Sequence, residues 1–261
     1  TEPASVLLDR IRTERRKQWE AKYPKKKYTE PEPIDDTNLP ELPDGWVWAS
    51  LEEVIRDGPR NGYSPATTPD ATGPLTLKLS ATTQRRMILN DQTTKRVPVS
   101  ISVDSDLWLV PGDILIQRSN TIEYVGACAI FQGLPNTYIY PDMMMRVRAE
   151  TDISNEYLCQ IINSPVTQKY IQSNATGTAG NMPKINSETV RRIPIAIPSK
   201  EEQLVLTRRL SSYLSLGDWL GDNFLKTEQE LCTLDQTILA KAFRGELVPQ
   251  DPKDEPASVL L

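Results

Sequence analysis

The sequence predicts an α+β fold, in which a globular domain with a mixed sheet and short helices precedes one long, coiled-coil-forming helix. In the first part, short apolar runs bounded by Gly, Pro and Asp outnumber the helical patterns. These runs do not alternate regularly with helices, which argues against a doubly wound sheet. A proline-free stretch, residues 199–244, then carries apolar residues every three or four positions, the spacing of a heptad repeat.

The N-terminal segment, residues 1–22, is expected to form a short basic helix. Pro3 suits a first turn, and Leu7, Leu8 and Ile11 form one apolar stripe. The basic residues of this segment indicate either a contact with phosphate or an acidic partner, or a solvated helix face, and the sequence favours neither. A charged, proline-containing linker, residues 23–38, is expected to follow in an extended form.

Residues 39–198 form the predicted globular domain. Strands are expected at residues 46–48, 75–79, 114–116, 127–131, 138–140, 143–147 and 193–197. A short helix is expected at residues 51–55, and a longer one at residues 155–172 with a break near Pro165. Residues 60–65 and 175–183 are rich in turn-forming residues and are expected to be loops.

Residues 199–245 are expected to form a dimerisation and spacer helix. Ser199 and Glu202 fit a capping box at its start, and Gly245 suits the position after its last turn. At about 1.5 Å per residue, such a helix is roughly 70 Å long and outruns a compact core. We therefore expect it to pair with a partner rather than with its own domain. The predicted seam, interrupted by Gly217 and Thr227, consists of Leu206, Leu210, Tyr213, Leu220, Phe224, Leu231, Leu234 and Ile238.

The composition is typical of a soluble protein, with 38% hydrophobic and 25% charged residues among 261. No apolar run approaches membrane-spanning length, and no signal-peptide pattern is present. The cysteines Cys128, Cys159 and Cys232 are scattered, as expected of reduced thiols in a cytoplasmic protein. The absence of histidine excludes histidine-dependent triads and the commonest zinc sites. We also find no phosphate-binding loop. Together with the absence of histidine, this leaves no catalytic or metal-binding residue to predict.

The two ends of the chain carry the same seven residues, EPASVLL, at positions 2–8 and 255–261. The tail, residues 246–261, therefore repeats the N-terminal segment, and the chain ends where a further copy of itself would begin. Such a repeat is expected of one unit in a cyclic arrangement of two units.

Five motifs in a fixed order add to the repeat. They are LPDGWVW (42–48), PGDIL (111–115), AGNMPKIN (179–186), IAIP followed by Glu202 and Gln203 (195–203), and LAKAFRGELVP (239–249). Each is weak alone, but together they resemble the specificity (S) subunit of type I restriction–modification systems over nearly the whole chain. The resemblance is closest to a half-subunit with one target recognition domain, because a full subunit holds two such domains and two conserved helices.

This resemblance implies a non-catalytic subunit that reads one half of a bipartite site on double-stranded DNA. Paired long helices would set the distance between two recognition domains and dock methylation (M) subunits, and restriction (R) subunits would join the assembled complex. The partner along the helix would be a second copy, giving a homodimer, or a different half-subunit, and no membrane is involved. The resemblance places S-adenosylmethionine and the methyltransferase and nuclease activities on the partners, and no cofactor on this chain.

Base edges are read by Arg, Lys, Asn and Gln, and phosphates are also bound by Ser, Thr and Tyr. Four segments concentrate such residues beside turns, and each could instead be a solvated loop. The candidate DNA-binding residues are Arg60, Asn61, Tyr63, Ser64, Gln84, Arg85, Arg86, Gln117, Arg118, Ser119, Asn120, Tyr124, Thr178, Asn181 and Lys184.

The net charge of −5 predicts weak binding of DNA by the chain alone, because non-specific affinity comes mainly from neutralised phosphates. It also fits a surface that meets basic partner subunits. Two other functions remain open at this point. A coiled-coil assembly protein would bind no DNA sequence selectively even with its partners, and a self-contained DNA-processing enzyme would need catalytic residues that we do not find.

Overall fold

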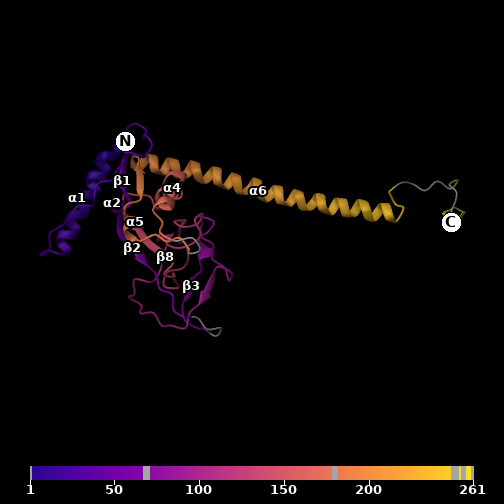
Figure 1. Ribbon diagram of the computed structural model, residues 1–261, viewed down its shortest axis with the longest axis horizontal. Coiled ribbons are helices and arrows are strands. Elements are labelled where there is room, and N and C mark those ends of the chain that lie inside the picture. Colours follow the sequence, from indigo (N-terminus) through magenta and orange to yellow (C-terminus); the bar gives the residue numbers. More distant parts are fainter. Residues whose placement is uncertain (1, 67–70, 178–181, 248–252, 254–256, 260–261) are drawn as a thin grey trace. The chain divides into compact units, whose positions relative to one another are not determined.

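The computed structural model describes residues 2–66, 71–177, 182–247, 253 and 257–259 (Figure 1). The chain divides into two compact units, Thr1–Thr207 and Arg208–Leu261, and each is described separately below. The first unit contains all the sheets, and the second consists mainly of the long helix.

An antiparallel, four-stranded sheet lies at the centre of the first unit. Its strands, in spatial order, are β2 (Ile55–Asn61), β8 (Met144–Ala149), β5 (Ile114–Gln117) and β6 (Cys128–Ile130). Side chains alternate between two apolar clusters, because successive residues of a strand point to opposite faces. Ile114 and Ile116 belong to the larger cluster, whereas Leu115 belongs to the smaller one. The sheet is thus buried on both faces.

Two smaller sheets complete the unit. β1 (Val47–Ser50) pairs with β9 (Pro194–Ile197) in antiparallel register, so the start and the end of the globular domain are joined. β3 (Leu75–Leu77) pairs in antiparallel register with β4 (Thr94–Arg96) and in parallel register with β7 (Tyr138–Ile139). This sheet is therefore mixed, and the predicted α+β class is confirmed.

Helices cover the larger apolar cluster. They are α1 (Ala4–Lys22), α2 (Leu51–Val54), α3 (Asn155–Ile162), α4 (Pro165–Ser173) and α5 (Ser187–Arg191), with a short 3-10 helix, η1 (Leu79–Ala81), under the smaller cluster. Pro165 separates α3 from α4, as expected, and begins α4 after the capping hydroxyl of Ser164. Leu7, Leu8 and Ile11 are buried, so the predicted apolar stripe of α1 packs against the rest of the first unit.

The basic face of α1 binds carboxylates of its own chain. Arg10 lies 2.5 Å from Asp152, and Arg12 lies 2.5 Å from Glu53. Arg15 approaches Glu52 at 3.8 Å. The sequence left a phosphate contact and a solvated face open for this helix, and the structure shows that these arginines instead attach α1 to its own domain.

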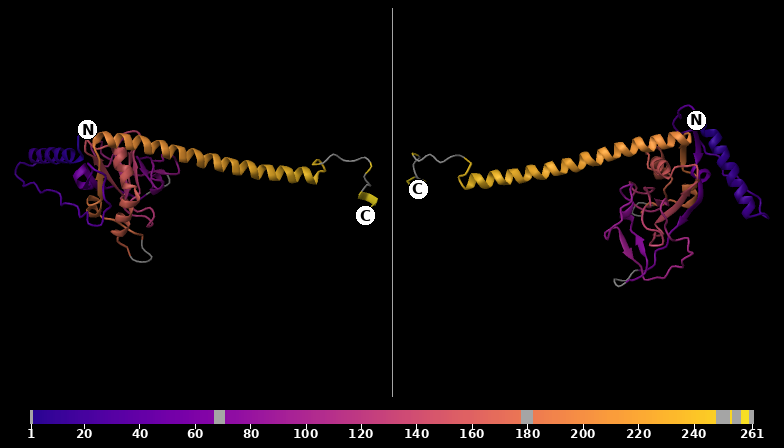
Figure 2. Two further views of the ribbon diagram at one scale, coloured as in Figure 1. Left: turned by 90° about the horizontal axis from the view of Figure 1, so that it is seen from above. Right: turned by 180° about the vertical axis from the view of Figure 1, so that it is seen from behind.

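The long helix α6 (Lys200–Phe243) is continuous in both views of Figure 2. Its start is the predicted capping box, because the Glu202 carboxylate accepts hydrogen bonds from the backbone N–H and the hydroxyl of Ser199 at 3.1 and 2.8 Å. These bonds lower the pKa of Glu202 below its ordinary value. Gly245 follows the helix with φ of 68°, which matches the predicted C-terminal glycine.

In the second unit, apolar side chains of α6 remain open to solvent. Tyr213 and Phe224 are both 70% exposed, and Leu231 is 57% exposed. A neighbouring row contributes further exposed apolar residues: Leu214, Leu225 and Leu239. The apolar face of α6 is therefore broader than the seam predicted from the sequence. Apolar surface of this extent is typical of protein–protein contacts.

Three local predictions were wrong or incomplete. Arg60 and Asn61 lie in β2 rather than in a loop, because they pair with Arg146 and Met145 of β8. β4 was not expected, since two of its three residues are charged and its apolar alternation is weak. α5 was also missed, because a helix of five residues leaves little periodicity to detect.

Candidate nucleic-acid interface

The candidate DNA-binding segments meet at one end of the four-stranded sheet. In the sheet register, Asn61 of β2 is opposite Met145, Gln117 of β5 is opposite Met144, and Ile116 is opposite Cys128. The end of β2, the end of β5, the start of β6 and the start of β8 therefore coincide. We call this the loop end: residues 60–66, 79–86, 117–127, 140–144, 176–177 and 182–184.

The first candidate segment, which begins at β2, is held against the residues that lead into β8. The backbone N–H of Tyr63 donates to the carbonyl of Tyr140 at 2.9 Å, and the Ser64 hydroxyl lies 2.6 Å from the Asp142 carboxylate. Gly62 is required here, because a Cβ would collide with the backbone carbonyls of Tyr140 and Pro141. Ser64 is thus already bonded to a carboxylate on this surface.

Gln117 joins two other candidate segments from inside the protein. Its side-chain amide donates to the hydroxyls of Thr82 and Thr83 at 2.9 and 3.2 Å, and its Oε1 accepts from Asn120 at 2.5 Å. Gln117 is fully buried, so the prediction that it contacts DNA directly does not fit its position. It positions the loop of Gln84 and the loop of Asn120 instead.

The segment after β5 runs beside Lys184 and Ile185, which follow the predicted loop at residues 175–183. Ser119 forms a backbone bridge with Lys184, and the N–H of Ile185 donates to the Arg118 carbonyl at 2.9 Å. Ser119 is only 4% exposed, so its side chain offers little surface for the predicted DNA contact. Arg118 is half-buried, and its Nε has no hydrogen-bond acceptor among the described residues.

The other candidates differ in exposure. Arg60, Asn61, Tyr63, Ser64, Gln84, Arg85, Arg86, Tyr124 and Lys184 are exposed, and Asn120 is half-buried. Thr178 and Asn181 lie outside the described residues. Arg86 donates to the Gln84 side chain at 3.0 Å, so these two side chains act as one group.

Arg60 belongs to an ion network beneath its segment. Its guanidinium lies 2.8 Å from Asp57 and 2.6 Å from Asp106. Asp57 also accepts from Arg146 at 2.8 Å, and Arg146 is completely buried. Arg60 therefore supports the sheet, and its charge is largely neutralised by these carboxylates.

Removal of the Asp57 charge would leave the Arg146 guanidinium buried without a carboxylate. We expect Asp57→Asn to lower the free energy of unfolding by about 3 kcal/mol, the range for a broken buried ion pair. Asp106→Asn is the matched control, because its side chain is 67% exposed and it keeps the backbone carbonyl that Arg146 also uses. The control should lose about 0.5 kcal/mol. Urea unfolding measures both losses. Equal losses would show that the buried Asp57–Arg146 pair stabilises the fold no more than the exposed Asp106 carboxylate.

The stability difference between wild type and Asp57→Asn should depend on pH. Burial raises the pKa of Asp57, but hydrogen bonds and charges from Arg60 and Arg146 outweigh burial and bring the pKa below its ordinary value. A lowered carboxyl pKa stabilises the fold above the unfolded pKa of about 3.9 and loses this effect as pH falls through the folded pKa. Wild type and Asp57→Asn should therefore converge in stability below about pH 4.

Two lysines that the sequence pattern did not single out lie beside the loop end. Lys78 and Lys95 line a cavity of about 290 Å³ together with Ser64 and Met143. Lys78 donates to the carbonyl of Gln92 at 2.9 Å. Lys78 follows β3 and Lys95 lies within β4, and no feature of the sequence predicted that these two strands lie beside the candidate segments.

Within the described parts of the chain, no group of three or more Cys, Asp and Glu residues is placed to hold a metal ion. No helix in those parts is both long and apolar enough to cross a membrane. Cys128 and Cys159 lie with their sulfurs 3.2 Å apart in the larger apolar cluster, although they are scattered in the sequence. Burial raises the pKa of the Cys128 thiol, which favours an unreactive, protonated form.

Curated relatives of the chain share one description. It is 27% identical to the type I restriction enzyme EcoEI specificity subunit of Escherichia coli over 87% of this chain, which corresponds to 39% of the relative. It is 28% identical to the EcoKI specificity subunit of Escherichia coli K12, over 76% of this chain and 42% of the relative. It is 29% identical to the EcoAI specificity subunit over the whole chain and 50% of the relative. The chain thus spans about half the length of these relatives, and no family model matches it.

Solved structures agree on the fold. One solved structure comes from work on complex assembly and conformational transition of the type I R-M system. It matches with a TM-score of 0.60 at 21% identity, over 94% of this chain and 58% of that one. The HsdS subunit from Thermoanaerobacter tengcongensis has a TM-score of 0.51 at 20% identity, over 94% of this chain and 57% of that one. In sequence the chain is similar to about half of a type I restriction enzyme specificity subunit, and it shares its fold with these solved structures.

Proposed function

We propose that this chain is a DNA sequence-recognition subunit of a type I restriction–modification system, which reads one half of a bipartite site. The observation that carries the proposal is the loop end of the four-stranded sheet. Segments from distant parts of the sequence meet there, with Arg85, Arg86 and Lys184 exposed and Arg118 half-buried. Arginine and lysine are the residues that most often contact guanine edges and phosphates.

The recognition surface within this proposal is narrower than the sequence suggested. Asn61, Tyr63, Gln84, Arg85, Arg86, Arg118, Asn120, Tyr124 and Lys184 remain candidates for contact with DNA. Gln117 and Ser119 serve to hold these residues, because they are buried. Arg60 and Ser64 are bonded to carboxylates, and they stabilise the surface more than they add to its charge.

The long helix supplies the second part of the proposed function. Its exposed apolar face pairs with the same helix of a second copy, or with another half-subunit, and so fixes the distance between two recognition domains. The exposed row that includes Leu214, Leu225 and Leu239 lies beside the predicted seam and widens this face. A two-stranded coiled coil covers a narrow stripe, whereas a bundle covers a wider face. The width therefore supports docking of methylation subunits along the paired helices.

Chemistry in this proposal belongs to the partners. The methylation subunits bind S-adenosylmethionine and methylate adenine, and the restriction subunits cut DNA after they join the complex. This chain contributes sequence selection, for which hydrogen-bonding side chains on a rigid sheet are sufficient.

The proposal predicts weak DNA binding by the chain alone and much tighter binding with its methylation subunit. The physical reason is the net charge of −5, which leaves few phosphates neutralised by this chain. Fluorescence anisotropy with a labelled duplex that carries the target site measures both states. We expect affinity to rise by at least about a hundredfold when the methylation subunit is added, a difference of roughly 2.7 kcal/mol. Tight, sequence-selective binding by the chain alone would contradict this prediction.

A further inference from the structure

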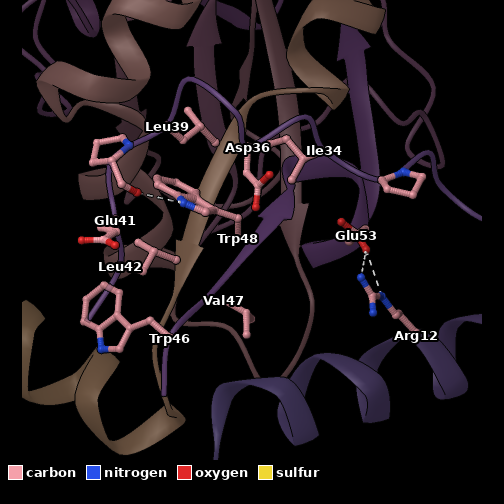
Figure 3. Close-up of a pocket in the computed structure, with 12 residues that line it drawn as sticks. Arg12, Ile34, Asp36, Leu39, Glu41, Leu42, Trp46, Val47, Trp48 and Glu53 are labelled. Carbon is pink, nitrogen blue, oxygen red and sulfur yellow. Dashed lines mark hydrogen bonds and ion pairs between the residues drawn. The ribbon is translucent and has the colours of Figure 1, made fainter. Parts of the chain in front are cut away.

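A cavity on the first unit lies away from the loop end and has no role in the function proposed above. Its volume is about 610 Å³, and it lies between the linker that follows α1 and strand β1 (Figure 3). The linker and the residues that follow it up to β1 form one wall with Ile34, Leu39 and Leu42. Trp46 and Trp48 form the other. We call it the tryptophan cavity.

Two indole rings form aromatic walls in this cavity. Trp46 directly precedes β1 and Trp48 lies within it, and both side chains line the cavity. Both are half-buried, and the Trp48 Nε1 donates to the carbonyl of Pro40 at 3.3 Å. Figure 3 shows this bond between the ring and the linker, which holds the linker beside the ring. The ring faces are suitable surfaces for a cation.

Carboxylates surround the indoles. The lining residues include Asp36, Glu41 and Glu53, and among the described residues Arg12 is the basic one that lines the cavity. Arg12 binds Glu53 at 2.5 Å, and Figure 3 shows this pair at the side of the cavity. Asp36 and Glu41 are exposed and form no side-chain ion pair within the described part of the chain. The cavity thus combines aromatic walls with negative charge that is not neutralised.

This combination selects one class of occupant. DNA is excluded, because its phosphates carry the same sign of charge as the rim. The chain's own tail is excluded on the same ground, since residues 246–261 contain four acidic residues and one lysine. A lysine or arginine side chain fits, because it places its charge near the carboxylates and its methylene groups on the indoles.

We propose that the tryptophan cavity binds a lysine or arginine side chain from a basic segment of the methylation subunit. The partner rests on the proposed function, and the docking site is additional to the face of α6. In this arrangement the acidic linker has a direct role: its carboxylates attract the basic segment, and the indoles hold the inserted side chain. Electrostatic contacts of this kind fix orientation and raise the association rate.

The test is the binding of full-length chain to the purified methylation subunit of the same system. Asp36→Asn combined with Glu41→Gln removes the rim charge, and neither side chain forms a hydrogen bond or ion pair with another described residue. We expect the dissociation constant to rise at least about tenfold at low salt, the change that corresponds to roughly 1.4 kcal/mol. The difference from wild type should shrink as salt increases, because exposed charges are screened. Isothermal titration calorimetry at two salt concentrations gives both results.

The matched control is Asp44→Asn, which removes an exposed carboxylate between the linker and β1 that does not line the cavity. This control should bind like wild type. If the double variant also binds like wild type, the tryptophan cavity is not the docking site, although docking on α6 would stand. If wild type itself forms no complex with the methylation subunit, both the docking site and the proposed function are wrong.

Discussion

Replacement of Leu231 and Leu234 by aspartate is expected to convert a dimer of this chain into monomers. Both residues lie on the apolar face of α6 and are more than half exposed in the single chain, at 57% and 53%. Helix pairing would bury them, and each buried unpaired carboxylate costs several kcal/mol. The dissociation constant should therefore rise by at least about a thousandfold, or roughly 4.1 kcal/mol. Multi-angle light scattering gives the mass directly.

A control variant separates pairing from helix stability. Thr233→Asp with Gln236→Asp adds the same charge to the same turns of α6, but outside the predicted seam. This control should remain a dimer with the same helical content by circular dichroism. If the Leu231 and Leu234 variant keeps the dimer mass, α6 is not the dimerisation element. If the control also dissociates, charge rather than seam position decides the result.

Insertion of four residues between Thr227 and Glu228 is expected to change the DNA site while the bases of each half-site stay the same. Four helical residues add about 6 Å to α6. With a rise of about 3.4 Å per base pair, the gap between the half-sites should grow by one or two pairs. Two identical recognition domains related by a two-fold axis read a two-fold site, so the target should be an interrupted palindrome in both cases. Sequencing of methylated sites checks both points.

Arg118→Ala provides the opposite change. Its side chain lies at the loop end, and its Nε has no acceptor among the described residues. If this residue reads a base, its loss should relax the half-site at that position and leave the gap unchanged. An insertion that changes the half-site bases, or an Arg118 variant that changes the gap, would mean that the two functions are not separated between domain and helix.

The sequence predicted the long helix most accurately because its signals are local. The capping residues Ser199 and Glu202 and the terminal Gly245 each act within one turn, and the observed bounds differ from the predicted ones by one residue or two. Most strands were also found, since β5 is almost entirely apolar and β8 begins with two methionines and contains a valine. The prediction missed short elements such as β4 and α5, because tertiary pairing rather than a local pattern forms them.

The candidate site was predictable in composition but not in detail. A buried glutamine uses the same amide that would read a base, so Gln117 could not be distinguished from a DNA contact until its threonine partners were known. Arg60 was misleading for a similar reason, because one of its two carboxylate partners, Asp106, is distant in sequence, and the nearby Asp57 was not recognised as a partner. The meeting of the segments at one end of the sheet depends on strand register, which no local pattern specifies.

A map of methylated adenines tests the central claim most directly, namely that this chain selects the sequence that its partner modifies. The same cells would express the methylation subunit with wild-type chain, with Arg118→Ala, or without the chain. We expect methylation at one interrupted palindrome with wild type, relaxed half-sites with Arg118→Ala, and no methylation at that site without the chain. Methylation of the same adenines with and without the chain would contradict the account. An asymmetric site would show that the chain works beside a different half-subunit rather than as a homodimer.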